Sequence, residues 1–143
     1  MKKIIILLLA CVVTSAAFAY EPNARVMKAF KETFTAAEDI RWQEYNDYYS
    51  VSFSYSGIRS KIQYDMEGNI LGSTRYYQPA LLPLHIYSKL KNLNSSKELF
   101  GVTEVTVGDE VVYFVKMQDA RNWITLKVDA SGNSSVYEKY RKG

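Results

Sequence analysis

The residue types that most often carry enzyme chemistry are scarce in this chain. His85 is the only histidine, and a histidine that acts as a general base needs an oriented partner and a nucleophile beside it. Cys11 is the only cysteine, and no Gly-x-Ser-x-Gly motif supplies a serine nucleophile. The sequence therefore predicts a protein that is not an enzyme. A hydrolase that pairs scattered carboxylates stays open as an alternative.

The sequence does not indicate a metal or cofactor site either. Zinc needs three or four His, Cys or carboxylate ligands, which one histidine cannot supply. The segment from Asp65 to Asn69 superficially resembles a calcium loop, but it lacks the further ligands of an EF-hand, so we interpret it as a hairpin turn. No Gly-rich phosphate loop is present. We therefore expect no cofactor and no bound metal.

The first residues have the order of a secretory signal peptide. Two lysines are followed by an apolar run from Ile4 to Val13 and by the small-x-small site Ala17-Phe18-Ala19. The apolar run is too short for an ordinary membrane span. We therefore expect residues 1–19 to be a signal peptide cleaved after Ala19, and the mature protein to be periplasmic or secreted.

Cys11 allows a second interpretation of the same segment. Leu8-Leu9-Ala10-Cys11 loosely resembles a bacterial lipobox, which would make the protein an outer-membrane lipoprotein anchored through Cys11. However, Leu9 is bulky for its position, and the residues after Cys11 stay apolar instead of turning polar. Cleavage after Ala19 is therefore the prediction, and only the lipoprotein alternative would involve a membrane.

The composition of the mature chain suits one small domain without disulfides. Its 124 residues are enough to bury a core, and it has no cysteine. Cleavage removes two of the 18 lysines and arginines against 15 acidic residues, so the net charge becomes +1. Because a nucleic-acid footprint needs a clustered basic face, we expect no nucleic-acid partner. The 12 tyrosines suit β-strands.

Apolar spacing predicts the order of the elements. Helical spacing over 20–37 predicts an amphipathic helix, with Pro22 at its first position. From Asp39 the spacing changes to two, which predicts strands, and a second helix is expected after Leu82-Pro83. The predicted strands are 40–43, 49–55, 58–64, 70–77, 102–107, 110–117, 123–128 and 134–140.

The chain repeats itself at an offset of 64 residues. Between 48–77 and 112–141 the two copies align without a gap, and we interpret their identities as core positions and turn residues. The identical pairs are Tyr49/Tyr113, Val51/Val115, Asp65/Asp129, Gly68/Gly132, Asn69/Asn133 and Tyr76/Tyr140.

The repeat predicts the fold class and its division. After the signal peptide we expect a unit over 20–80 and a second unit over 81–143, together one compact domain. Each unit is one helix plus a four-stranded antiparallel sheet, because hairpin connections give antiparallel strands. The class is α+β, with a continuous or concave sheet and the helices on one face.

The order of short motifs resembles a known family. The motifs are Ile40-Arg41-Trp42, Tyr49 to Phe53, Asp65 to Gly68, Leu82-Pro83, Tyr113 to Val115 and Asp129 to Gly132. In this order and duplication the chain is similar to the PepSY-like, β-lactamase-inhibitor-like (BLIP-like) proteins exported by Bacteroides-type bacteria, over most of its mature length. The resemblance implies a concave sheet with helices on its back, and a binding or inhibitory role without catalytic residues. Inhibition of a β-lactamase does not follow, because function lies in the site and not in the scaffold.

One face of the sheet is the candidate binding surface. If Tyr49 and Tyr113 face the helices, the opposite strand positions face water, while Trp42 could lie on either side. Aromatic residues and arginine are enriched in interface hot spots. The candidate binding residues are Tyr48, Arg59, Lys61, Phe114, Trp123 and Lys127. We expect an unidentified protein or peptide as the partner, with a small ligand or glycan as the alternative. A loop or a second copy covering the aromatics also stays open.

Overall fold

The computed structural model describes residues 20–143. The predicted signal peptide and Cys11 lie outside the described residues. The helices are α1 (Ala24–Thr33) and α2 (Leu84–Leu93), and a short 3-10 turn η1 (Pro79–Leu81) precedes α2. The strands are β1 (Glu38–Glu44), β2 (Tyr49–Tyr55), β3 (Ile58–Tyr64), β4 (Ile70–Tyr77), β5 (Glu98–Val107), β6 (Glu110–Gln118), β7 (Asn122–Asp129) and β8 (Ser134–Arg141).

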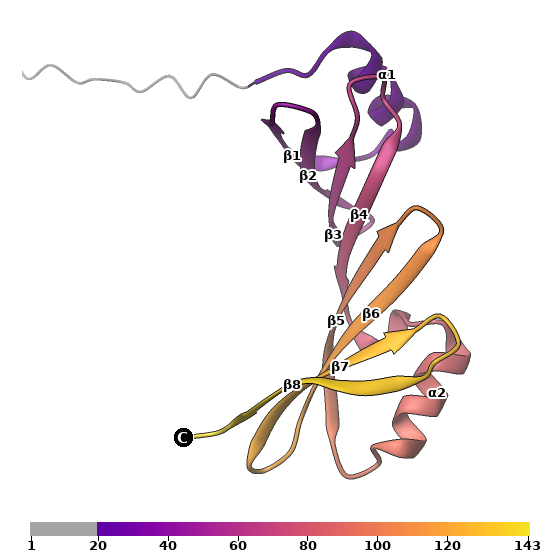
Figure 1. Cartoon of the computed structure of the whole chain (residues 1–143), viewed down its shortest axis with the longest axis vertical. Coiled ribbons are helices and arrows are strands. Elements are labelled where there is room, and N and C mark those ends of the chain that lie inside the picture. The colour runs from indigo at the N-terminus through magenta and orange to yellow at the C-terminus, as the bar shows by residue number, and fades with distance from the viewer. Residues whose placement is uncertain (1–19) are drawn as a thin grey trace, which may run out of the picture.

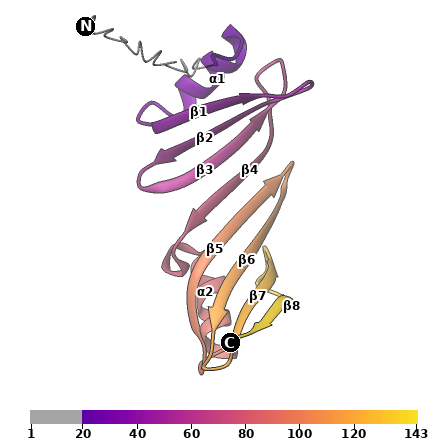
Figure 2. The same ribbon diagram turned by 90° about the vertical axis from the view of Figure 1, so that its left-hand side faces the viewer.

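The eight strands form one antiparallel sheet in sequence order, from β1 at one edge to β8 at the other. Figures 1 and 2 show an elongated molecule in which α1 lies at one end and α2 at the other. The α+β class and the two tandem units are thus confirmed. The first unit is α1 with β1–β4, the second is α2 with β5–β8, and the pairing of β4 with β5 joins their sheets into one.

The core of the first unit is rich in aromatic side chains. Val26 and Phe30 lie one turn apart on α1 and are buried against strand residues such as Val51. The ring centroid of Phe30 lies 5.0 Å from that of Phe53 and 5.2 Å from that of Trp42, both edge to face. Trp42 lies opposite Val51 on the neighbouring strand, so it is on the helix side of the sheet.

The core of the second unit is mainly aliphatic. Ile86 and Leu90 of α2 are fully buried against the strands. Their buried partners on the strands are Val102, Val115, Met117, Ile124, Leu126 and Val128. Because each such side chain contributes about 1.5–3 kcal/mol when removed from water, this cluster is enough to hold α2 on the sheet.

A polar seam separates the two cores on the helix side of the sheet. Tyr77 of β4 lies opposite Val102 of β5, which places both helices on the same face. An Arg75 nitrogen lies 3.3 Å from one Glu104 oxygen, and the Tyr77 hydroxyl donates a hydrogen bond to the other. The Glu104 side chain is only 14% exposed. The seam therefore compensates a nearly buried carboxylate where neither helix covers the sheet.

Equivalent turns fasten each helix to its unit. Asp65 accepts hydrogen bonds from the backbone of Glu67 and Asn69 and from the Asn69 side chain. Asp129 makes the corresponding bonds in the second unit. Gly68 has φ +93°, and an added Cβ would lie 3.1 Å from a carbonyl oxygen of α1. The expected hairpin turns are thus confirmed, and each one is also a helix contact.

The N-terminus of α1 is later than the sequence predicts. Asn23 is the N-cap and accepts a hydrogen bond from the Val26 backbone at 3.0 Å. The prediction that Pro22 occupies the first helical position is therefore wrong, because Asn23 caps the helix and Ala24 is its first residue. The Asn23 amide also donates to the Met66 carbonyl at 2.9 Å and so ties the cap to the first turn.

Two further expectations need correction. β5 begins at Glu98, four residues before the predicted start, because a bulge around Phe100 breaks the alternation that marks a strand. Not all repeated residues are core or turn residues either. Tyr76 and Tyr140 are 46% and 61% exposed, so the repeat also retains a tyrosine on the water-facing side.

Candidate binding surface

The register of the strands defines a helix-free face of the sheet. Tyr49 and Tyr113 are buried in the two cores, so both side chains face the helices. Neighbours of opposite parity therefore lie on the other side of the sheet. Pairing places five of the candidate residues there, on three strands: Arg59 and Lys61 on β3, Phe114 on β6, and Trp123 and Lys127 on β7.

An aromatic patch covers the helix-free face of the second unit. The ring of Phe114 packs edge to face on Tyr137, with centroids 5.0 Å apart. Trp123 packs in the same way on Phe100 at 5.5 Å and is 44% exposed. Lys142 covers one side of Trp123, with its ammonium nitrogen 4.3 Å from the ring centroid. We name this set the aromatic patch: Phe100, Phe114, Trp123, Tyr137 and Tyr140.

A basic hollow of about 620 Å³ lies on the same face of the first unit. Its cations come from two strands, Arg41 on β1 and Arg59 and Lys61 on β3. Hydroxyl groups from β2 and β4 lie between and beside them. We name this set the basic hollow: Arg41, Ser52, Ser54, Arg59, Lys61 and Tyr76, with Asp39 as the one acid of the lining.

Tyr48 lies apart from the other candidate residues. It precedes β2 in the β1–β2 hairpin, and its ring stacks on Tyr45 with centroids 4.4 Å apart. Ser54, which lies opposite Arg59, is six residues further along the chain. At about 3.3 Å per residue this puts Tyr48 roughly 20 Å from the Arg59 end of the strand. The structure therefore brings Arg59 and Lys61 together but leaves Tyr48 outside the basic hollow.

Sequence reasoning missed residues in both places. Phe100 and Tyr137 sit at β-bulges, where the alternation that assigns a residue to a face fails. Arg41 and Tyr76 have the correct parity, but only the pairing of four strands shows that they border one hollow. Extending the parity argument from β3 to its neighbours could have found these two residues, while no sequence signal marks the bulges.

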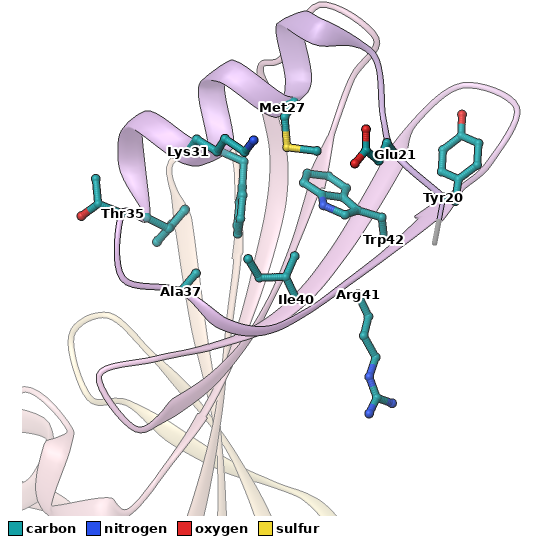
Figure 3. A pocket seen from close by; sticks show the side chains of 11 residues that line it. Tyr20, Glu21, Met27, Lys31, Thr35, Ala37, Ile40, Arg41 and Trp42 are labelled. Carbon is teal, nitrogen blue, oxygen red and sulfur yellow. The ribbon is translucent and has the colours of Figure 1, made fainter. Parts of the chain in front are cut away.

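A separate cleft opens on the helix side, between α1 and the edge strand β1. It has a volume of about 810 Å³, and Figure 3 shows Met27, Ile40 and Trp42 around it. Arg41 borders the cleft but points away from α1 in the same view. Tyr20 stands at one end, where a hydrogen bond with the Glu44 carboxylate raises the pKa of Tyr20. The lining is mostly apolar, which suits an apolar group more than a charged one.

Two tyrosines on the helix side have shifted pKa values for different reasons. Burial raises the pKa of Tyr64 to about 12, and its hydroxyl has no hydrogen-bond partner. Burial also raises the pKa of Tyr77, and the hydrogen bond to Glu104 adds to this effect. Both hydroxyls stay protonated at neutral pH. Neither is therefore available as a base, and both belong to the packing of the sheet.

Residues 20–143 contain no cluster of three or more His, Cys, Asp or Glu side chains that could hold a metal ion. The helices of this region are also too short or too polar to cross a membrane.

Solved structures of other proteins share this fold. A DUF2874 family protein from Bacteroides ovatus matches with a TM-score of 0.62 and 15% sequence identity, over 85% of this chain and 89% of the other. A BLIP-like protein from Bacteroides fragilis matches with a TM-score of 0.63 and 15% identity, over 85% and 87%. A protein from Bacteroides eggerthii that is proposed to be periplasmic matches with 0.62 and 13%, over 85% and 90%.

Identities this low show the fold and not the activity. No protein-family model and no curated protein matches the chain. None of the three structures is described as PepSY-like, so that part of the resemblance stays a prediction. The chain therefore has the fold of the BLIP-like and DUF2874 proteins of Bacteroides.

Proposed function

We propose that this protein is an exported, non-enzymatic binding module that holds a protein or peptide against the helix-free face of its sheet. The observation that carries the proposal is the aromatic patch. Trp123, Tyr137 and Tyr140 are 44%, 58% and 61% exposed and lie on neighbouring strands. Exposed aromatic clusters of this kind are typical of binding surfaces, because a protein without a partner gains nothing by keeping them in water.

The width of the face favours a macromolecule over a small ligand. Arg59 on β3 and Phe114 on β6 lie in one row of paired residues, three strand spacings of about 4.8 Å apart, so roughly 14 Å separates them. Trp123 lies one strand further, on β7, and four residues along from Lys127, the partner of Phe114. A single sugar or metabolite cannot span that distance. A protein surface can, since a stable interface covers about 800 Å² of each partner. A glycan bound only on the aromatic patch is the alternative.

The comparisons support the setting of this proposal. One protein of the same fold is BLIP-like and another is proposed to be periplasmic, and both agree with an exported module. Cleavage after Ala19 and release into the periplasm or the medium belong to the same proposal. So does the absence of catalysis, because the face presents aromatic rings and cations instead of converging carboxylates.

A pull-down from envelope extract of the native host tests the function. The bait is the protein purified after export with its own leader, beside a Phe114→Ser/Trp123→Ser variant. We expect the wild type to retain a protein that the variant loses, because truncating two aromatic anchors removes most of the energy of a typical interface. Circular dichroism and the unfolding midpoint verify that the variant is folded.

A matched control removes two exposed apolar side chains elsewhere. Leu84 and Leu93 of α2 are 78% and 65% exposed on the helix side, so Leu84→Ser/Leu93→Ser should leave the partner bound. Equal retention by the wild type and the aromatic variant would show that the partner binds another surface. If the wild type retains no protein but binds glycans through Trp123, the alternative replaces the proposal.

A further inference from the structure

We propose that the basic hollow of the first unit binds carboxylate side chains of an acidic segment of the partner protein. This inference rests on the proposed function and names the chemistry that the partner presents. It follows from the arrangement of cations in the hollow, from the lack of an ion pair to any of these cations within residues 20–143, and from the continuity of the hollow with the rest of the helix-free face.

The cations and hydroxyls of the hollow form a regular grid. Arg41 on β1 lies opposite Ser52 on β2, and Ser52 lies opposite Lys61 on β3. One step along, Ser54 lies opposite Arg59. Opposite residues have Cβ atoms about 5 Å apart, so Arg41 and Lys61 flank the serine at roughly 10 Å from each other. Long side chains from both sides can therefore converge on one anionic group above Ser52.

No cation of the hollow forms an ion pair within the described residues. Over residues 20–143, the carboxylate–cation pairs within 4.0 Å are Lys28 with Glu32 and Arg75 with Glu104, and neither pair includes a cation of the hollow. Asp39 of β1 is the single acid of the lining, and Glu38 of the same strand lies opposite Ser54. Neighbouring like charges repel one another, and an incoming anion relieves that repulsion. The first unit thus presents an excess of positive charge in one place.

The groups match carboxylates in particular. A guanidinium donates two parallel hydrogen bonds to a carboxylate, and the serine hydroxyls supply further donors between the cations. The tyrosine hydroxyl at position 76 lies on the same face, opposite Arg59. Because the acids Glu38 and Asp39 lie on β1, a bound carboxylate is favoured toward the cations of β3, Arg59 and Lys61.

The open shape of the hollow favours a segment of a protein over a free anion. A smaller hollow of about 220 Å³ shares Lys61 and Tyr76 with it and extends over β4 to Val105 on β5. The row of paired residues Arg59, Tyr76, Thr103 and Phe114 crosses the helix-free face from the basic hollow to the aromatic patch. A partner that places apolar side chains on that patch therefore has adjacent chain available to place acidic residues over the first unit.

Peptide binding measured by fluorescence anisotropy tests the inference. The probes are a labelled glutamate–serine repeat peptide and its glutamine–serine counterpart, and the protein is the exported full mature chain. We expect the glutamate peptide to bind more tightly than the glutamine peptide. Binding should weaken as salt rises toward about 0.15 M, because exposed charges are screened over about 8 Å there.

Two variants with the same change in net charge locate the site. Arg41→Gln/Arg59→Gln/Lys61→Gln should weaken the glutamate peptide by about tenfold or more, since three exposed pairs are lost together. The matched control, Lys91→Gln/Arg121→Gln/Lys139→Gln, removes exposed cations of the second unit. It should change the affinity by less than about twofold.

Four results would overturn the inference. These are no binding of the glutamate peptide, equal binding of both peptides, an equal loss in the control variant, and tighter binding of a heparin fragment through the same cations. The pull-down separates this inference from the proposed function. If the hollow variant keeps a partner that the Phe114→Ser/Trp123→Ser variant loses, the function stands and the carboxylate site does not.

Discussion

The two units place their aromatic side chains on opposite sides of the same scaffold. In the first unit the rings lie inside, where Phe30, Phe53 and Trp42 pack under α1. In the second unit the core is mainly aliphatic and the rings lie outside, in the aromatic patch. The fold therefore requires apolar side chains on the helix side of the sheet, while the residue types on the helix-free face can differ between the units.

Equivalent positions of the repeat carry a cation in the first unit and an aromatic ring in the second. Arg59 in the first unit corresponds to Trp123 in the second at the offset of 64 residues. Each lies opposite the exposed tyrosine that the repeat retains, Arg59 beside Tyr76 and Trp123 beside Tyr140. The basic hollow and the aromatic patch therefore include equivalent positions of the two units. One protein face thus carries an electrostatic half and an apolar half.

The largest expected effects are losses of stability from cavities in the two cores. Phe30→Ala should lower the free energy of unfolding by about 3–5 kcal/mol and Leu90→Ala by about 2–5 kcal/mol, because each leaves a cavity under its helix. Urea denaturation measures both. Since the continuous sheet and the seam couple the units, we expect one transition in each variant. Two separate transitions would instead show that the units unfold independently.

An intermediate loss of stability is expected when the two turn glycines are substituted. Gly68→Ala should destabilise the protein more than Gly132→Ala, although both residues have positive φ, +93° and +81°. An added Cβ at Gly68 meets the Arg25 carbonyl oxygen at 3.1 Å, whereas at Gly132 it meets Cδ of the flexible Lys89 side chain at 3.3 Å. We expect about 1–2 kcal/mol for Gly132→Ala and a larger loss for Gly68→Ala, measured by thermal unfolding.

An equal loss in both glycine variants would mean that the contact with α1 relaxes as easily as the lysine side chain. Gly57→Ala provides the control for backbone strain alone. Gly57 has φ +76°, and no atom lies within 4 Å of the added Cβ.

The smallest expected effect is a loss of folding stability at acid pH. Hydrogen bonds from the Asn69 and Asn133 side chains hold the pKa values of Asp65 and Asp129 below their usual range. Such carboxylates stabilise the fold above their unfolded pKa of about 3.9, and this contribution is lost as pH falls through the lower folded pKa. Stability should therefore decline below about pH 4. Asp65→Asn/Asp129→Asn should make that decline shallower.

Unfolding midpoints measured from neutral pH down to acid check this expectation. Asp47→Asn is the control, because within residues 20–143 the Asp47 side chain makes no hydrogen bond like those of Asp65 and Asp129. A decline as steep in the double variant as in the wild type would assign the acid sensitivity to other groups. Asp119, whose pKa is lowered by the backbone of Arg121, is the next group to substitute.

Local sequence patterns predict most of the strands and turns. Alternation from Tyr49 to Tyr55 and the glycine at 68 each follow from chemistry within a few residues, and both agree with the structure. The repeat then predicts the second unit from the first. The α1 start was missed because the choice between Pro22 and Asn23 depends on a hydrogen bond to a turn more than 40 residues away.

The candidate site is less accessible to the same reasoning. Parity alone places Arg59, Phe114 and Trp123 on one face, but a bulge shifts the parity at Phe100 and at Tyr137. The basic hollow needs the pairing of four strands, and the separation of Tyr48 needs the length of β2. These are long-range properties that no short stretch of sequence contains.

The simple strand order has a consequence for how the protein behaves at high concentration. An open sheet that runs from β1 to β8 has two edges, and an unpaired edge can template addition of another chain. Both edge pairs contain a bulge, and the edge strands carry charges such as Glu44 and Lys139. Bulges and charges make an edge a poor template for fibre growth. The chain can thus keep a long open sheet at high protein concentration without promoting aggregation.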